Sequence, residues 1–232
     1  GLRWLRAHAA PDVVAPRAAD FAAFEGVCLA HLRDFDRVRA RLDEARRLDP
    51  ASPWVRVEAA AALELEDRVD EALEATAEAL SLRAHYHPAL RLRAHLLAQR
   101  DRREEAVALL DGAPHAAQSF ELLGMRAEMA RSLGGYGRCV DDLTQARAAA
   151  VHADPRVCEG VAGGLSEALY LLRRYREAAA AAEPLAKGVL GGFVEALRAL
   201  ADGAAPPRVE LTGVPHIRQD HVTCAPASVA QI

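Results

Sequence analysis

Residues 35–50 read FDRVRARLDEARRLDP, and residues 69–84 read VDEALEATAEALSLRA. When the first stretch is set over the second, apolar and small residues fall in the same slots: Phe35 on Val69, Val38 on Ala72, Leu42 on Thr76, Ala45 on Ala79 and Leu48 on Leu82. The same slots return after a further 34 residues at Ala106, Leu110 and Ala113, and after 33 more at Tyr136, Cys139, Leu143 and Ala146. A looser fifth copy places Tyr175, Ala178, Ala182 and Leu185 in them. Self-similarity at a fixed period predicts a repeat architecture.

A second helical stretch precedes each copy, at residues 20–33, 53–66, 87–100, 119–133 and 157–172. One slot in these stretches always holds a small residue: Gly26, Ala60, Ala94, Ala127 and Ser166. Short polar turns join the two helices of a unit, and Pro53 and Pro88 suit helix starts because proline lacks a free N–H. The sequence therefore predicts pairs of helices that approach closely wherever a small side chain recurs.

These residues resemble the tetratricopeptide repeat (TPR). Gly26, Val38, Ala45 and Pro50 match the family's pattern in the first unit, whereas later units lose the proline and most aromatic residues. The resemblance implies an all-α protein, an α-solenoid of about five helical hairpins over residues 18–202 with a closing helix at 193–202, after a preceding helix or N-terminal cap at 1–17. A plain helical bundle is the alternative, and the regular 34-residue spacing argues against it.

In TPR proteins the first helices line a concave face, which the resemblance implies for this chain as well. The slots one turn away from the small packing residues then face a ligand, and they hold His31, Trp54, Glu64, Arg91, His95, Gln99, Glu128, Arg131, Glu167 and Tyr170. This groove is mixed in charge, with Trp54 and Tyr170 as apolar anchors, and suits a peptide or protein segment. With a single lysine, Lys187, and no asparagine, the chain does not suit the family's clamp for a C-terminal carboxylate. The alternative for each residue is an ordinary solvated helix face.

The composition changes after residue 203, where 203–210 reads as a linker and 211–232 as the start of another domain. Gln219 and the run Thr223-Cys224-Ala225-Pro226 resemble the beginning of the C39-type, papain-like cysteine peptidases. The resemblance implies that Cys224 is the nucleophile, favoured as thiolate at a helix N-terminus, and that Gln219 stabilises the oxyanion. Ala225 stands where glycine is usual, and the family's histidine and aspartate come later than Ile232. We therefore expect the natural protein to continue into a peptidase-like domain and this chain alone to be inactive; a chance match, or a purely structural scaffold, is the alternative.

Composition excludes several classes. The net charge of −4 and the absence of a basic stripe argue against nucleic-acid binding, and no apolar run is long enough for a membrane span. The widely spaced cysteines indicate reduced thiols and a cytoplasmic protein. Cys28, Cys139 and Cys158 fall on repeat faces and are expected to be small core residues. His85 and His87 lie in a turn between units, so no metal site and no cofactor are indicated, and exposed solenoid ends are expected to allow self-association.

Overall fold

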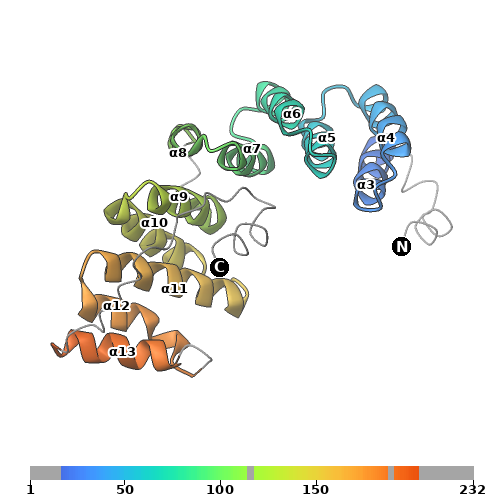
Figure 1. The fold of residues 1–232 in the computed structure, drawn as a ribbon. Coiled ribbons are helices and arrows are strands. Elements are labelled where there is room, and N and C mark those ends of the chain that lie inside the picture. The colour runs from blue at the N-terminus through green and yellow to red at the C-terminus, as the bar shows by residue number, and fades with distance from the viewer. Residues whose placement is uncertain (1–16, 114–117, 188–190, 204–232) are drawn as a thin grey trace, which may run out of the picture. The chain divides into compact units, whose positions relative to one another are not determined.

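The computed structural model describes residues 17–113, 118–187 and 191–203. Within these residues the chain is all-α. Its elements are α3 (Ala18–His31), α4 (Phe35–Leu48), α5 (Pro53–Leu65), α6 (Val69–Leu82), α7 (His87–Gln99), α8 (Arg103–Asp111), α9 (Phe120–Ser132), α10 (Tyr136–Ala149), α11 (Pro155–Leu171), α12 (Tyr175–Ala182), the short 3-10 helix η3 (Glu183–Leu185) and α13 (Gly191–Ala201) (Figure 1). The chain divides into two compact units, residues 1–116 and 117–232.

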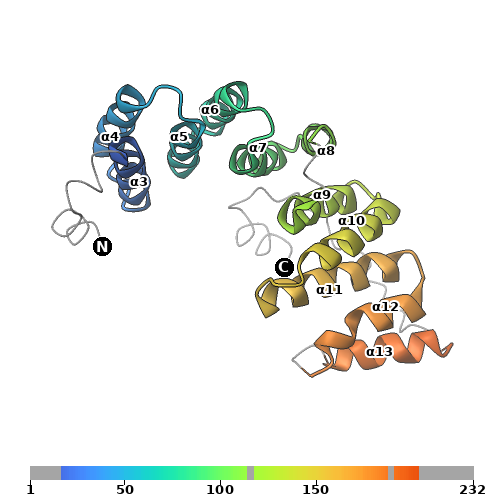
Figure 2. The same ribbon diagram turned by 180° about the vertical axis from the view of Figure 1, so that it is seen from behind.

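Each unit is a series of helical hairpins. In the first unit α3 pairs with α4, α5 with α6, and α7 with α8, while the first helices also pack on one another, α3 on α5 and α5 on α7. In the second unit α9 pairs with α10, α11 with α12, and α13 packs on α12. The view from behind shows the same sequential pairing inside each unit (Figure 2). The predicted solenoid of about five helical hairpins is therefore confirmed.

The recurring small residues lie where the helices of a hairpin touch. Ala60, Ala94 and Ser166 are fully buried, and Ala127 is almost fully buried. A Cβ added to Gly26 would lie only 3.1 Å from the side chain of Leu42 in α4. Ser166 adds a hydrogen bond to this close packing, because its Oγ donates to the backbone carbonyl of Ala178 in α12 at 2.9 Å. Small side chains at this slot let two helix backbones approach, as the repeat pattern predicts.

The turn between the two helices of every hairpin has one geometry. The second residue after the first helix has a left-handed backbone in all five hairpins, with φ between 59° and 78°: Arg33, Asp67, Asp101, Gly134 and Arg173. Its N–H donates to the carbonyl three residues earlier, and the next N–H donates to the carbonyl five residues earlier. This paired bonding is the Schellman motif, which satisfies the last carbonyls of a helix. Glycine is the residue usually found there, yet four of these five positions carry another residue.

Capping residues fix the start of several first helices. Ser52 and Ser119 accept hydrogen bonds from backbone N–H groups in the first turns of α5 and α9, each at 3.3 Å. Asp154 does the same for α11 at 2.8 Å, followed at once by Pro155. Such caps satisfy N–H groups that a helix start leaves without an internal partner. The caps explain why these helices begin within two residues of the starts that the sequence predicts.

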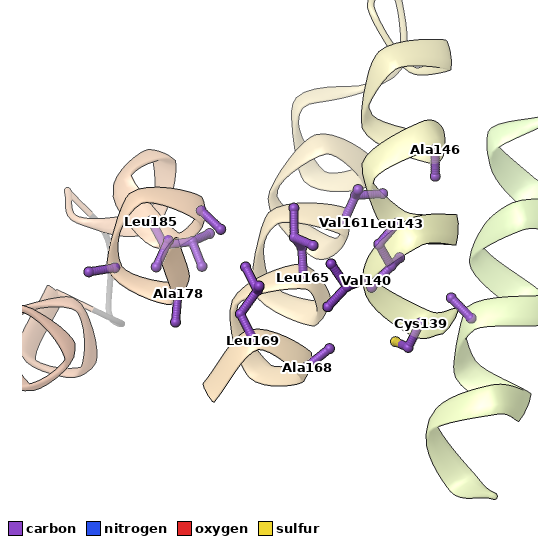
Figure 3. Close-up of a cluster of buried hydrophobic side chains, with 14 of the residues drawn as sticks. Cys139, Val140, Leu143, Ala146, Val161, Leu165, Ala168, Leu169, Ala178 and Leu185 are labelled. Atoms are coloured by element: carbon purple, nitrogen blue, oxygen red, sulfur yellow. The ribbon is translucent and has the colours of Figure 1, made fainter. Parts of the chain in front are cut away.

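Each unit has its own apolar core. The core of the second unit runs through α9, α10, α11, α12 and α13. Figure 3 shows part of it, with Val140 and Leu143 of α10 beside Val161 and Leu165 of α11. Two leucines of the repeat pattern do not join a core, because Leu48 and Leu82 lie exposed at the ends of their helices.

The three described cysteines differ in how exposed they are to solvent. Cys139 is buried and Cys28 half-buried. Cys158 is exposed, so the expectation that it is a core residue is wrong. It lies in the first turn of α11, before the stretch of that helix that packs into the core.

No helix among the described residues is long and apolar enough to cross a bilayer. The cap or preceding helix expected at 1–17 falls almost wholly outside the described residues, as do the linker and the peptidase-like segment expected at 203–210 and 211–232. Cys224 and Gln219 belong to that last segment, so their roles stay predictions.

Candidate functional site: a groove between α9 and α11

The ten predicted groove residues fall into two sets, one in each unit. His31, Trp54, Glu64, Arg91, His95 and Gln99 belong to the first unit, and Glu128, Arg131, Glu167 and Tyr170 to the second. The two sets differ in how their side chains meet one another.

In the first unit three predicted residues close on one another. His95 Nε2 lies 2.9 Å from Glu64 Oε1, and Gln99 Nε2 donates to the same carboxylate oxygen at 2.7 Å. Gln99 Nε2 also lies 2.8 Å from His95 Nε2. The network ties α5 to α7, whose backbones are already close. It bridges the two helices with side chains that bond to each other.

The other three residues of the first set lie apart from that network. The indole of Trp54 is half-buried and packs against the core formed by α3, α4 and α5. His31 and Arg91 are exposed, in the last turn of α3 and in the middle of α7. Trp54 therefore contributes to the core of the first unit, and its role as a ligand anchor stays a prediction.

In the second unit the space between the first helices is open. α9 and α11 make little direct backbone contact, and between them lies a cavity of about 320 Å³. Its walls and floor come from α9, α10 and α11: Phe120, Glu121, Gly124, Ala127, Glu128, Arg131, Cys139, Leu143, Val157, Gly160, Val161, Gly164 and Glu167. We call this cavity the α9–α11 groove. Its volume is at the lower end of the range of about 300–1,000 Å³ typical of ligand sites.

Glycines give the groove its room. A Cβ built on Gly124 of α9 or on Gly160 of α11 would meet no heavy atom within 4 Å, so both backbones face open space. Gly164 is different, since a Cβ there would lie 3.2 Å from Leu143 Cδ1 on the groove floor. Glycine inside a helix costs roughly 0.5–1 kcal/mol relative to alanine. At Gly124 and Gly160 no neighbouring atom of the described residues accounts for glycine in place of alanine.

Three predicted residues, Glu128, Arg131 and Glu167, lie at the mouth of this groove. Arg131 donates from Nε and Nη2 to the two carboxylate oxygens of Glu128, at 2.9 and 2.6 Å. Its Nη1 donates across the groove to Glu167 Oε1 at 3.3 Å. The hydrogen bonds that Arg131 donates to Glu128 raise the pKa of its guanidinium, which stays charged. Tyr170, the fourth residue of this set, lies one turn further along α11 and contacts the ring of Tyr175 at a centroid distance of 5.7 Å.

The floor of the groove is apolar. Cys139 and Leu143 of α10 and Val161 of α11 are buried there, with Phe120 half-buried at one end. Burial raises the pKa of the Cys139 thiol to about 11, so it is a neutral, weakly nucleophilic group at physiological pH. The groove therefore has an apolar floor beneath a polar rim. A covalent reaction at Cys139 is not favoured.

Selecting the residues one turn away from the small packing residues finds Glu128, Arg131 and Glu167 but misses most of the groove lining. The missed residues include Gly124 and Gly160. For Gly160 one signal is present in the sequence: three glycines, at 160, 163 and 164, inside one helical stretch. Glycine is among the poorest helix formers, so a cluster of it in a helix indicates a close approach or an open surface. In the described residues no group of three or more His, Cys, Asp and Glu side chains could hold a metal ion.

The fold is that of a TPR-like solenoid. No family model and no curated protein matches the chain. Among solved structures it is similar to PilF of Pseudomonas aeruginosa, with a TM-score of 0.60 and 17% identity over 78% of this chain and 82% of that one. It is also similar to TTC0263, a TPR protein of Thermus thermophilus, with a TM-score of 0.53 and 19% identity over 79% of this chain and 98% of that one.

A third similar structure is BtubC from P. vanneervenii, with a TM-score of 0.60 and 16% identity over 88% of this chain and 90% of that one. All three identities lie below the level at which function is shared, so these likenesses establish the fold alone.

Proposed function

We propose that the chain is a protein-interaction module whose α9–α11 groove binds a short peptide segment of a partner protein. The observation that carries the proposal is the open groove itself, with Gly124 and Gly160 facing empty space above an apolar floor. Glycine lets a ligand backbone approach a helix closely, and an apolar floor rewards a buried side chain. A structure with a related fold, Cut9–Hcn1 of the APC/C, is a hetero-tetramer, so such a fold occurs within a protein complex.

The two units support this choice of site. In the first unit Glu64, His95 and Gln99 bond to one another and bridge α5 and α7. In the second unit the hydrogen bond from Arg131 to Glu167 crosses between α9 and α11 at the groove rim. A ligand entering the second unit displaces one long hydrogen bond, whereas one entering the first unit must separate three bonded side chains.

Groove filling tests the proposal. A random peptide library displayed on phage is selected against the chain, and the affinities of recovered peptides are measured by calorimetry for the wild type, Gly160→Leu and Gly137→Leu. Gly160 lines the groove and a Cβ there meets no heavy atom of the described residues within 4 Å, so we expect leucine at 160 to occupy groove space and to weaken binding at least tenfold. Gly137 is exposed in α10 outside the groove and has equally open space, so leucine there leaves affinity unchanged. Recovery of no peptide whose binding depends on residue 160 refutes the proposal.

The peptidase-like interpretation of the C-terminal segment stays a prediction. It rests on Gln219 and the Cys224-Ala225-Pro226 run, with the solenoid as the part that recruits a substrate or partner. In a longer natural product carrying a histidine and an aspartate or asparagine after Ile232, Cys224→Ser is expected to abolish peptide hydrolysis. The cytoplasmic location, and self-association through the ends of the solenoid, also stay predictions.

A further inference from the structure

The charges around the α9–α11 groove are unequal. Its lining holds three carboxylates, Glu121, Glu128 and Glu167, against one guanidinium, Arg131. Two of these carboxylates already bond to Arg131, which leaves an excess of two negative charges beside the apolar floor.

Arg131 offers a ligand few donors, because three of its five N–H groups already bond to carboxylates of the chain. Nε and Nη2 hold both oxygens of Glu128, and Nη1 points to Glu167. A carboxylate, by contrast, has about four lone-pair sites and can accept a further donor after binding one arginine. The side chains of Glu128 and Glu167 are 62% and 52% exposed, so a donor from solvent can reach both. Glu121, in the first turn of α9, is exposed as well.

We propose that the groove selects a partner segment in which an apolar side chain stands next to a lysine or arginine. The apolar side chain occupies the floor between Leu143, Val157 and Val161, and the cation lies against the carboxylates of the rim. This inference rests on the proposed function, because it names the chemistry of the segment that the groove would bind. An acidic segment would place its charge against the excess negative charge and is disfavoured.

The same peptide selection tests this inference separately from the proposed function. Among peptides whose binding is lost in Gly160→Leu, we expect Lys or Arg beside Leu, Ile, Val, Met or Phe to be enriched. Their affinity is expected to fall about tenfold between roughly 0.05 M and 0.5 M salt, because salt screens exposed charges. Groove-dependent peptides that are neutral or acidic would overturn the inference and leave the peptide-binding proposal standing.

A charge reversal gives a second readout. For a recovered basic peptide we expect Glu121→Lys to weaken binding about tenfold. The matched reversal Glu195→Lys, on an exposed residue of α13 outside the groove, is expected to change affinity less than twofold. Equal affinities of Glu121→Lys and wild type, with binding still lost in Gly160→Leu, would also overturn charge selection. If the chain sediments as a dimer and Gly160→Leu makes it a monomer, the groove belongs to a second copy and the inference is wrong.

Discussion

The turn after each first helix allows a sharp test of the repeat geometry. Arg173 follows α11 with φ near 59°, and its equivalent in the preceding hairpin is Gly134 with φ near 78°. Both are exposed, and both belong to the second unit. If the two turns share one Schellman motif, glycine should suit position 173 as well as it suits position 134. We therefore predict that Arg173→Gly stabilises the chain and that Gly134→Ala destabilises it.

The magnitudes follow from the backbone alone. A left-handed conformation costs an L-residue roughly 1–2 kcal/mol, and glycine avoids that cost. The greater freedom of glycine in the unfolded chain takes back about 0.4–1 kcal/mol. The expected net gain for Arg173→Gly is therefore about 0.5–1 kcal/mol. Gly134→Ala should lose a similar net amount with no added clash, because a Cβ there meets no atom of the described residues within 4 Å.

Thermal and urea unfolding followed by circular dichroism measure both changes. In a chain of this size a change of about 1 kcal/mol shifts the midpoint by roughly 2–4 °C. Arg173→Ala is the control, since alanine removes the guanidinium but keeps the left-handed strain, and it should lie within about 0.5 kcal/mol of the wild type. A gain in Arg173→Ala equal to that in Arg173→Gly, or an unchanged Gly134→Ala, would refute the shared turn geometry.

Two further predictions concern buried groups in the second unit. Arg126 donates to both carboxylate oxygens of the buried Asp142 at 2.9 and 2.5 Å, so Arg126→Met should lower the free energy of unfolding in urea by about 3 kcal/mol. The double variant Arg126→Met with Asp142→Leu should recover most of that loss, because it leaves no buried charge unpaired. Equal losses in the single and double variants would contradict this prediction. Because burial raises the pKa of Cys139 from an ordinary value near 9 to about 11, the unfolded chain loses the thiol proton first. Stability should therefore fall as pH rises from about 9 to about 11, and Cys139→Ala, followed by urea unfolding across this range, should remove that part of the decline; the same decline in both chains would be evidence against a buried Cys139.

The sequence predicts the repeat because each unit can bury its apolar face only against a neighbour. Period, small residues and polar turns are therefore all constrained at once, as Ala60, Ala94 and Ser166 show by being fully buried. Residue type alone does not predict the left-handed turns, because four of their five positions hold residues other than glycine: Arg33, Asp67, Asp101 and Arg173. The packing of the two helices in a hairpin imposes this left-handed conformation. The usual preference for glycine reflects only the free energy that another residue type loses there.

The groove is only partly predictable, for a related reason. A slot rule applies equally to all units, and it selects Glu64 and Gln99 as readily as Glu128 and Arg131. Whether two first helices close or stay apart depends on how the side chains between them meet in space. In the first unit His95 reaches Glu64 at 2.9 Å, whereas in the second Gly124 and Gly160 leave the space empty. A sequence pattern built on apolar and charged side chains does not mark such a space, because the residues that leave it open are glycines.

The most direct test of the account is backbone amide NMR of the chain titrated with a peptide recovered by the library selection. We predict that the largest shift changes fall on Gly124, Gly160 and Gly164, whose amide signals lie in a well-separated region of the spectrum. Little change is expected outside the groove lining, along Asp141 and Gln145 of α10 and Glu177 of α12. Shift changes concentrated on α10 and α12, with the three glycines unmoved, would contradict the assignment of the α9–α11 groove as the binding site.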